Sequence, residues 1–169
     1  MPGMDFEKLG LFYLGTHYDA AKHTRTDEPV LYDSSDLLTH AVCIGMTGSG
    51  KTGLGIALME EAAIDGLPVL AIDPKGDLSN LMLTFPGLTA AEFAPWVNPD
   101  EARTQQLTPE AFAEKEATRW KAGLAEWGED GARIARLKAA ADVAIYTPGS
   151  RTGLPLSILE TFNAPPKGI

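Results

Sequence analysis

The chain has 169 residues, 44% of them hydrophobic and 22% charged, which is the composition of one ordinary globular domain. This composition excludes a disordered or collagen-like chain, and no apolar stretch reaches the ~20 residues that span a bilayer. Fourteen Lys and Arg against 23 Asp and Glu give a net charge of −9, which disfavours broad nucleic-acid binding by this chain alone. A single cysteine, Cys43, and no secretory signal pattern lead us to expect a cytoplasmic protein.

The N-terminal part of the chain predicts one strand followed by irregular structure. Residues 10–15 form an aromatic-rich run between two glycines, which is typical of a short strand. Residues 17–29 are polar and predict a loop, and Ser34 is placed to start a brief helical turn. The apolar residues 41–44, two of them β-branched, then predict a buried strand.

A helix and a second strand follow directly. Residues 52–65 carry apolar side chains at helical spacing, and Gly66 is the residue type that ends a helix. Residues 68–72 predict another buried strand. Strand, glycine-rich turn, helix and strand thus follow one another within about 35 residues, which is the repeating unit of a parallel sheet.

The remaining elements continue the alternation. Thr108 predicts a helix cap, with Pro109 at the favoured first helical position. Residues 131–142 predict a further helix, and residues 143–146 predict a third strand that a turn at 147–150 closes. The sequence therefore predicts an α/β fold.

One motif carries chemistry. The segment from residue 45 to residue 52 matches the phosphate-binding pattern GxxxxGK[ST] at every fixed position. Its residues are Gly45, Met46, Thr47, Gly48, Ser49, Gly50, Lys51 and Thr52. The glycines allow successive amides to point inward as a nest for an anion, and the helix that follows directs its positive end at the same place. We expect Lys51 to reach the β- and γ-phosphates of a nucleotide, as a catalytic as well as a binding group, and the Thr52 hydroxyl to ligate Mg²⁺. The alternative, a flexible Gly-Ser linker, does not join a strand to an amphipathic helix so tightly.

Asp73 is the candidate for a second catalytic and metal-binding group. It directly follows the predicted strand 68–72, where a carboxylate can hold the Mg²⁺ shell through water. The alternative interpretation is structural: Asp73 and Asp77 bracket a Pro-Lys-Gly turn, in which Lys75 is either a solvated residue or a phosphate ligand.

Other conspicuous residues have simpler interpretations. The three histidines lack metal-ligand spacing. The tryptophans and Phe112 are expected in a core or at a partner surface rather than on a base-stacking platform. Arg133 and Arg136 lie three residues apart on a predicted helix and are expected on a solvated face, with phosphate neutralisation as the alternative.

Three segments, taken in order, resemble a known family. Residues 40–52, residues 68–77 with their Ile-Asp-Pro-Lys-Gly-Asp sequence, and residues 145–157 are similar to the ATPase domain of the HerA and FtsK group of motors. The resemblance implies a RecA-like P-loop NTPase core, a mostly parallel sheet flanked by helices. It also implies ATP and Mg²⁺ as ligands and hexameric rings that move or unwind DNA. Residues 1–30 then form an N-terminal segment and residues 31–169 the core.

The resemblance also implies that the core is incomplete. In the family, the strand with paired acids, the sensor and the arginine finger lie downstream of the segment that resembles residues 145–157, and none is found before Ile169. We therefore expect an N-terminal part of a longer motor, which binds ATP with little turnover and contacts DNA through regions outside this chain. A small P-loop kinase and a non-catalytic nucleotide-sensing module remain the alternatives.

Overall fold

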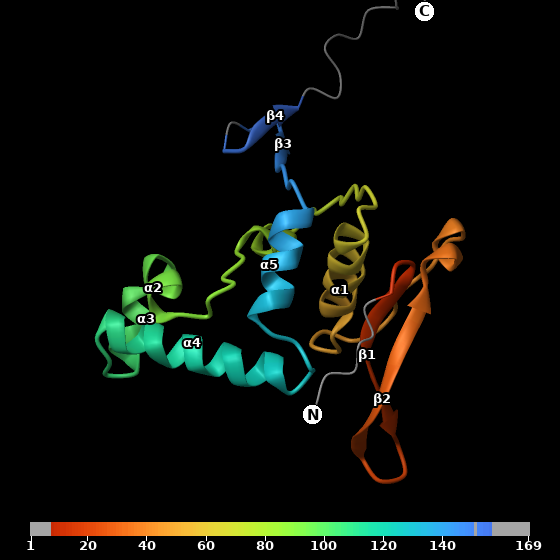
Figure 1. Ribbon diagram of the computed structural model, residues 1–169. Helices are drawn as coiled ribbons and strands as arrows, with labels where there is room; N and C mark the ends of the chain where they lie inside the picture. Colours follow the sequence, from red (N-terminus) through yellow and green to blue (C-terminus); the bar gives the residue numbers. More distant parts are fainter. Residues whose placement is uncertain (1–7, 151, 157–169) are drawn as a thin grey trace, which may run out of the picture.

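The first elements are two antiparallel strands, β1 (Leu11–Asp19) and β2 (Thr24–Asp33), in a computed structural model that describes residues 8–150 and 152–156. They form a long hairpin at one side of the molecule (Figure 1). Its turn is closed by the Asp19 carboxylate, which accepts the amides of Ala21 at 2.9 Å and Lys22 at 3.1 Å. The predicted strand at 10–15 is thus confirmed, whereas the loop predicted at 17–29 is wrong, because pairing with β1 orders this polar segment.

The helical turn predicted after residue 33 is confirmed as η1 (Ser34–Leu38). The Asp33 carboxylate caps it by accepting the Ser35 amide at 2.9 Å. The predicted division of the chain after residue 30 stays a prediction, and β2 runs across that position.

The central helix, α1 (Lys51–Ile64), confirms the helix predicted between the glycine-rich turn and Gly66. It ends two residues before Gly66, which adopts a left-handed backbone with φ of 73°. Helix α5 (Gly131–Ala140) lies beside α1, and β1 packs against α1 from the other side (Figure 1). The phosphate-binding motif thus stands at the start of a helix that two distant parts of the chain support.

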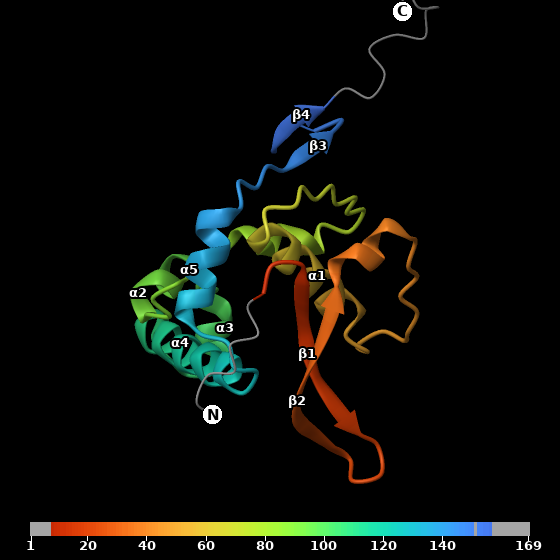
Figure 2. The ribbon, with the colours of Figure 1, turned by 45° about the vertical axis from the view of Figure 1, so that its right-hand side comes forward.

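A lobe of helices occupies the opposite side of the molecule (Figures 1 and 2). It contains α2 (Ala90–Phe93), η3 (Ala94–Trp96), α3 (Pro99–Thr104) and α4 (Pro109–Ala125). The predicted cap of α4 is confirmed, since the Thr108 hydroxyl accepts the Ala111 amide at 3.2 Å. The lobe has its own core around Phe93, Ala113 and Ala117, with the rings of Phe85 and Phe93 4.7 Å apart. Burial of this apolar surface holds its short helices together.

Two predicted strands, at 41–44 and 68–72, have no regular secondary structure and pair with no strand among the described residues. Their side chains are strongly exposed: Val42 82%, Ile44 89%, Leu70 91% and Ile72 85%. A strand is stable only when a neighbour pairs its backbone groups and its side chains pack, and neither condition is met here. The single mostly parallel sheet expected from the sequence is therefore not present in the part of the chain that the structure describes.

The third predicted strand begins three residues later than expected, as β3 (Tyr146–Pro148). It pairs in parallel with β4 (Leu154–Leu156), with Tyr146 opposite Leu154. This small sheet lies beyond the end of α5 (Figure 1). The structure as described is therefore a mixed α/β arrangement with one antiparallel and one parallel pair of strands.

Candidate nucleotide-binding site

The phosphate-loop motif forms a tight turn before α1. Gly48 and Gly50 have φ of 81° and 90°, in the left-handed region that side-chain-bearing residues rarely adopt. The Ser49 amide donates to the Met46 carbonyl at 3.2 Å and closes the turn. A methyl group on Gly45 would collide with the Ser49 hydroxyl, so a side chain at this position would force Ser49 to move. The left-handed backbone explains the fixed glycine at position 50 and favours the additional glycine at position 48.

The Lys51 side chain folds back over this turn. Its ammonium donates to the carbonyl oxygens of Gly45 at 2.7 Å and Met46 at 2.5 Å, and lies 3.5 Å from the Ser49 hydroxyl. The carbonyls therefore hold the one cation of the loop above its backbone. An anion at the loop would meet this positive charge after the lysine side chain exchanges the carbonyls for the anion.

The first turn of α1 supplies further donors. The first intrahelical bond runs from the Leu54 amide to the Gly50 carbonyl at 2.9 Å. The amides of residues 51–53 therefore have no carbonyl partner within the helix, as at any helix start. Thr52 lies in this turn and is exposed. Left-handed glycines, helix-start amides and a lysine together fit a bound phosphate chain, and the Thr52 hydroxyl is available as a hard oxygen ligand for Mg²⁺.

Asp73 has a structural role in the turn that follows residues 68–72. One carboxylate oxygen accepts the amides of Lys75 at 3.2 Å and Gly76 at 2.9 Å, and the other accepts the Leu78 amide at 2.8 Å. The hydrogen bond from the Leu78 amide has the largest effect, and together these bonds lower the pKa of Asp73 below its usual value. Asp73 thereby organises the start of η2 (Asp77–Met82), and its predicted part in the Mg²⁺ shell stays a prediction.

Two acidic side chains near the end of α1 fasten the helix to the hairpin. Glu61 is buried, with 7% of its surface exposed, and accepts the Tyr13 amide at 3.0 Å. Asp65 accepts the Gly10 amide at 2.8 Å. Acidic groups at a helix C-terminus are unfavourable to the helix dipole, so these two need the donors that the hairpin brings.

Arg133 completes this anchor from α5. Its guanidinium is bonded to the Glu61 carboxylate, and its Nε lies 2.7 Å from Glu129. The Arg133 side chain is only 12% exposed, so the expectation of a solvated face is wrong for this residue. Burial, together with the charge of Arg136, lowers the pKa of Arg133 to about 10.

The same burial affects the carboxylates around Arg133. Burial first, and then the charges of Glu60 and Asp130, raise the pKa of Glu129 from 4.5 to about 7. The contact with the Arg133 guanidinium opposes this rise, and the desolvation of a side chain only 19% exposed outweighs it. Burial also raises the pKa of Glu60. This cluster of charges is the most strongly perturbed group near α1.

Sequence reasoning missed this anchor. Its one visible signal is the pair Glu60 and Glu61 at the C-terminal end of an otherwise apolar helix, where acids are disfavoured. That signal indicates that a positively charged side chain must pair with these acids, but it does not identify which of the chain's arginines does so.

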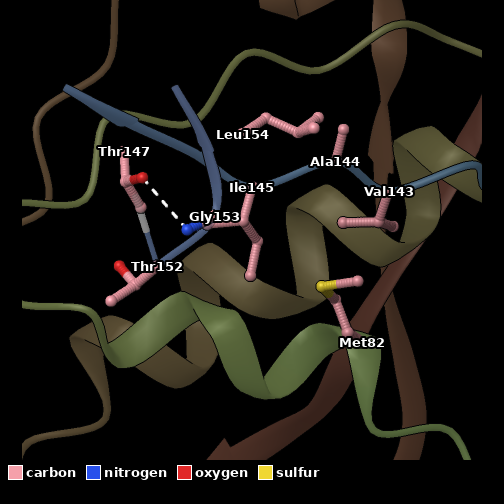
Figure 3. Close-up of a pocket in the computed structure, with 8 residues that line it drawn as sticks. All are labelled: Met82, Val143, Ala144, Ile145, Thr147, Thr152, Gly153 and Leu154. Carbon is pink, nitrogen blue, oxygen red and sulfur yellow. Dashed lines mark hydrogen bonds between the residues drawn. The ribbon is translucent and has the colours of Figure 1, made fainter. Parts of the chain in front are cut away.

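An open apolar cavity of about 480 Å³ lies next to the small parallel sheet. Figure 3 shows Val143, Ala144 and Ile145 along it, with Met82 of η2 at the opposite side. The Gly153 amide donates to the Thr147 hydroxyl at 3.1 Å and ties β4 to β3 at its edge. The third segment that the sequence predicts as a strand therefore borders unfilled apolar space.

The comparisons with known proteins agree with one another. The profile of the family described as the central domain of the helicase HerA matches residues 12–148. The type 4 coupling protein DotL of Legionella pneumophila is 38% identical over 55 residues, which are 32% of this chain and 7% of that protein. The aligned stretch thus spans only a small part of this relative. No solved structure matches the chain. Within residues 8–150 and 152–156, no helix has both the length and the apolar character needed to cross a membrane.

Proposed function

Because the chain belongs to the family of the HerA central domain, we propose that it binds ATP with Mg²⁺ at residues 45–52, as the nucleotide-binding part of a motor ATPase. The observation that carries this proposal is the loop itself: left-handed Gly48 and Gly50 stand before α1 with the Lys51 ammonium over the turn. The same likeness to motor ATPases disfavours the small kinase as an alternative.

Each group of the loop has a defined part in the proposal. Amides at the start of α1 bind the phosphate oxygens, and Lys51 leaves the carbonyls of Gly45 and Met46 to contact the β- and γ-phosphates. Thr52 holds Mg²⁺, which neutralises charge on the phosphates. Asp73, if it takes part, does so through water, because both of its oxygens already accept amides.

The proposal includes a RecA-like sheet built from residues 41–44, 68–72 and 143–146. Supporting it are the exposed apolar side chains of the first two segments and the apolar cavity along the third. Pairing in parallel would bury these side chains and satisfy their backbone groups. The carboxyl ends of 41–44 and 68–72 would then place the phosphate loop and Asp73 at one edge, where nucleotides bind in α/β sheets.

The resemblance to the HerA and FtsK motors implies hexameric rings, and we propose that assembly here. DNA is the proposed substrate of that assembly. With a net charge of −9, this chain leaves the DNA contacts to other regions. Its own contribution is to bind the nucleotide.

Calorimetry with Mg-ATP tests the proposed binding. Lys51→Ala should weaken binding at least tenfold, because it removes the only cation that the structure places over the loop turn. Lys121→Ala is the matched control, since it removes a lysine from an exposed position on α4 and should leave affinity unchanged. Equal affinity of the Lys51→Ala variant and the unmodified chain would overturn the proposal.

A further inference from the structure

The three tryptophans of the chain all lie in or beside the helical lobe, and two of them hold an arginine in the same way. Arg25 stacks on the Trp127 ring, 4.0 Å from its centroid, and pairs with Glu126 at 3.5 Å. Arg119 lies 5.5 Å from the centroid of Trp120 and pairs with Glu116 at 2.5 Å. An aromatic face beside a carboxylate thus binds two of the protein's guanidinium groups, both at the lobe.

The third tryptophan has the aromatic face and the carboxylate without the arginine. Trp96 is 61% exposed and lines a cavity of about 260 Å³ together with Glu101. Phe93 and Phe112, both buried, form its apolar wall. Among the described residues, no cation lies over Trp96, and the Glu101 carboxylate forms no hydrogen bond or ion pair.

The lobe does not supply that cation itself. Arg103 pairs with Asp100 at 2.9 Å, and Lys115 donates to Gln105 at 2.5 Å. Arg119 is held by Glu116, the other carboxylate that lines the cavity. From Ala90 to Glu126, acidic residues outnumber basic ones, so the field of the lobe attracts a positive group.

We propose that this cavity is a docking surface for an arginine-bearing segment of a partner protein. The guanidinium stacks on Trp96 and pairs with Glu101, while an adjacent apolar side chain fills the cavity against Phe93 and Phe112. A cavity of this size takes one or two side chains rather than a cofactor. The surface is separate from the phosphate loop, so the proposal does not depend on nucleotide binding.

The test observes the indole N–H signals of the isotope-labelled chain by NMR, with the Trp96 signal assigned by a Trp96→Phe variant. The probe is a short synthetic peptide of repeated Leu-Arg-Ala, and its twin carries Glu in place of Arg. The arginine peptide should shift the Trp96 signal saturably, and the acidic twin should leave it in place. Glu101→Gln should weaken binding roughly two- to fivefold, as expected for a partly exposed ion pair.

Glu114→Gln is the matched control, because it removes an equal charge from an exposed position on α4. This variant should bind the arginine peptide as the unmodified chain does. The proposal is overturned if the Trp96 signal does not move at millimolar peptide, or if the acidic twin shifts it equally. Equal weakening by Glu101→Gln and Glu114→Gln also overturns it, because general attraction to an acidic lobe would then explain the binding.

Discussion

The guanidinium of Arg133 on α5 is bonded to the buried carboxylate of Glu61 on α1, 72 residues earlier in the chain. Glu61 also accepts the Tyr13 amide, so one carboxylate joins α1, α5 and the hairpin. The helix that begins with the phosphate loop is therefore fixed at its far end by charge as well as by packing.

Replacing Arg133 should destabilise the fold strongly. Arg133→Ala leaves Glu61 buried without its cation, and breaking such a pair costs about 3–5 kcal/mol in the free energy of unfolding. Urea denaturation measures this loss. Arg103→Ala is the control, because its pair with Asp100 is largely exposed and should contribute less than about 1 kcal/mol. Similar losses in the two variants would show that the Arg133 pair is no more important than a surface contact.

The stability of the fold should fall as pH rises toward 7. The pKa of Glu129 is about 7 in the folded chain and near 4.5 when unperturbed, so between these values the folded state binds the extra proton. The stabilisation that Glu129 adds to the free energy of unfolding is present in full below about pH 4.5 and is lost as pH rises through 7.

Glu129→Gln should reduce this pH dependence by about 1–3 kcal/mol between pH 5 and pH 8, measured by urea denaturation at several pH values. The Gln side chain cannot ionise, so the folded state loses its extra proton uptake. Asp142→Asn, a change of another acidic residue outside the cluster, should leave the profile unchanged. A profile for Glu129→Gln that matches the unmodified chain would assign the titration to another group.

Cys43 reports on the proposed sheet. It is the single cysteine of the chain and is exposed, within residues 41–44, which form no strand in the structure. A thiol reagent should therefore react with it rapidly in the absence of nucleotide. If Mg-ATP draws residues 41–44 into a paired sheet, the reaction should slow at least tenfold, and Lys51→Ala should abolish that protection. Unchanged labelling at an ATP concentration that calorimetry shows to be saturating would contradict the proposed pairing.

Asp73→Asn should act on the local turn rather than on the metal. The substitution weakens the bonds to the amides of Gly76 and Leu78, so it should lower the stability of this turn. Mg-ATP affinity should change less than threefold in calorimetry. Loss of the Mg²⁺ dependence of binding would instead place Asp73 in the metal shell.

The parts of the structure that the sequence predicts are those with local causes. The glycines of the phosphate loop and the Thr108–Pro109 cap specify their backbone within a few residues, and both α1 and α4 begin where expected. The turn from Ser34 has its own capping carboxylate, Asp33. Such features are determined by neighbouring residues alone.

The features that the sequence does not predict depend on distant partners. β2 is a polar segment that becomes a strand because β1 pairs with it. The burial of Arg133 depends on Glu61, which no periodicity relates to it. Residues 41–44 and 68–72 show the converse, since strand-forming composition does not produce a strand where no neighbour pairs with it.

The Tyr13 hydroxyl donates to the Trp127 carbonyl at 2.9 Å, across 114 residues of chain. At a typical synthesis rate of about 5–20 residues per second, a ribosome needs on the order of ten seconds to make the intervening chain. The hairpin itself closes within microseconds of its emergence. The hairpin is covered first by α1, which packs against β1, and the Tyr13 hydroxyl must wait for its acceptor until the residues that follow α4 leave the exit tunnel.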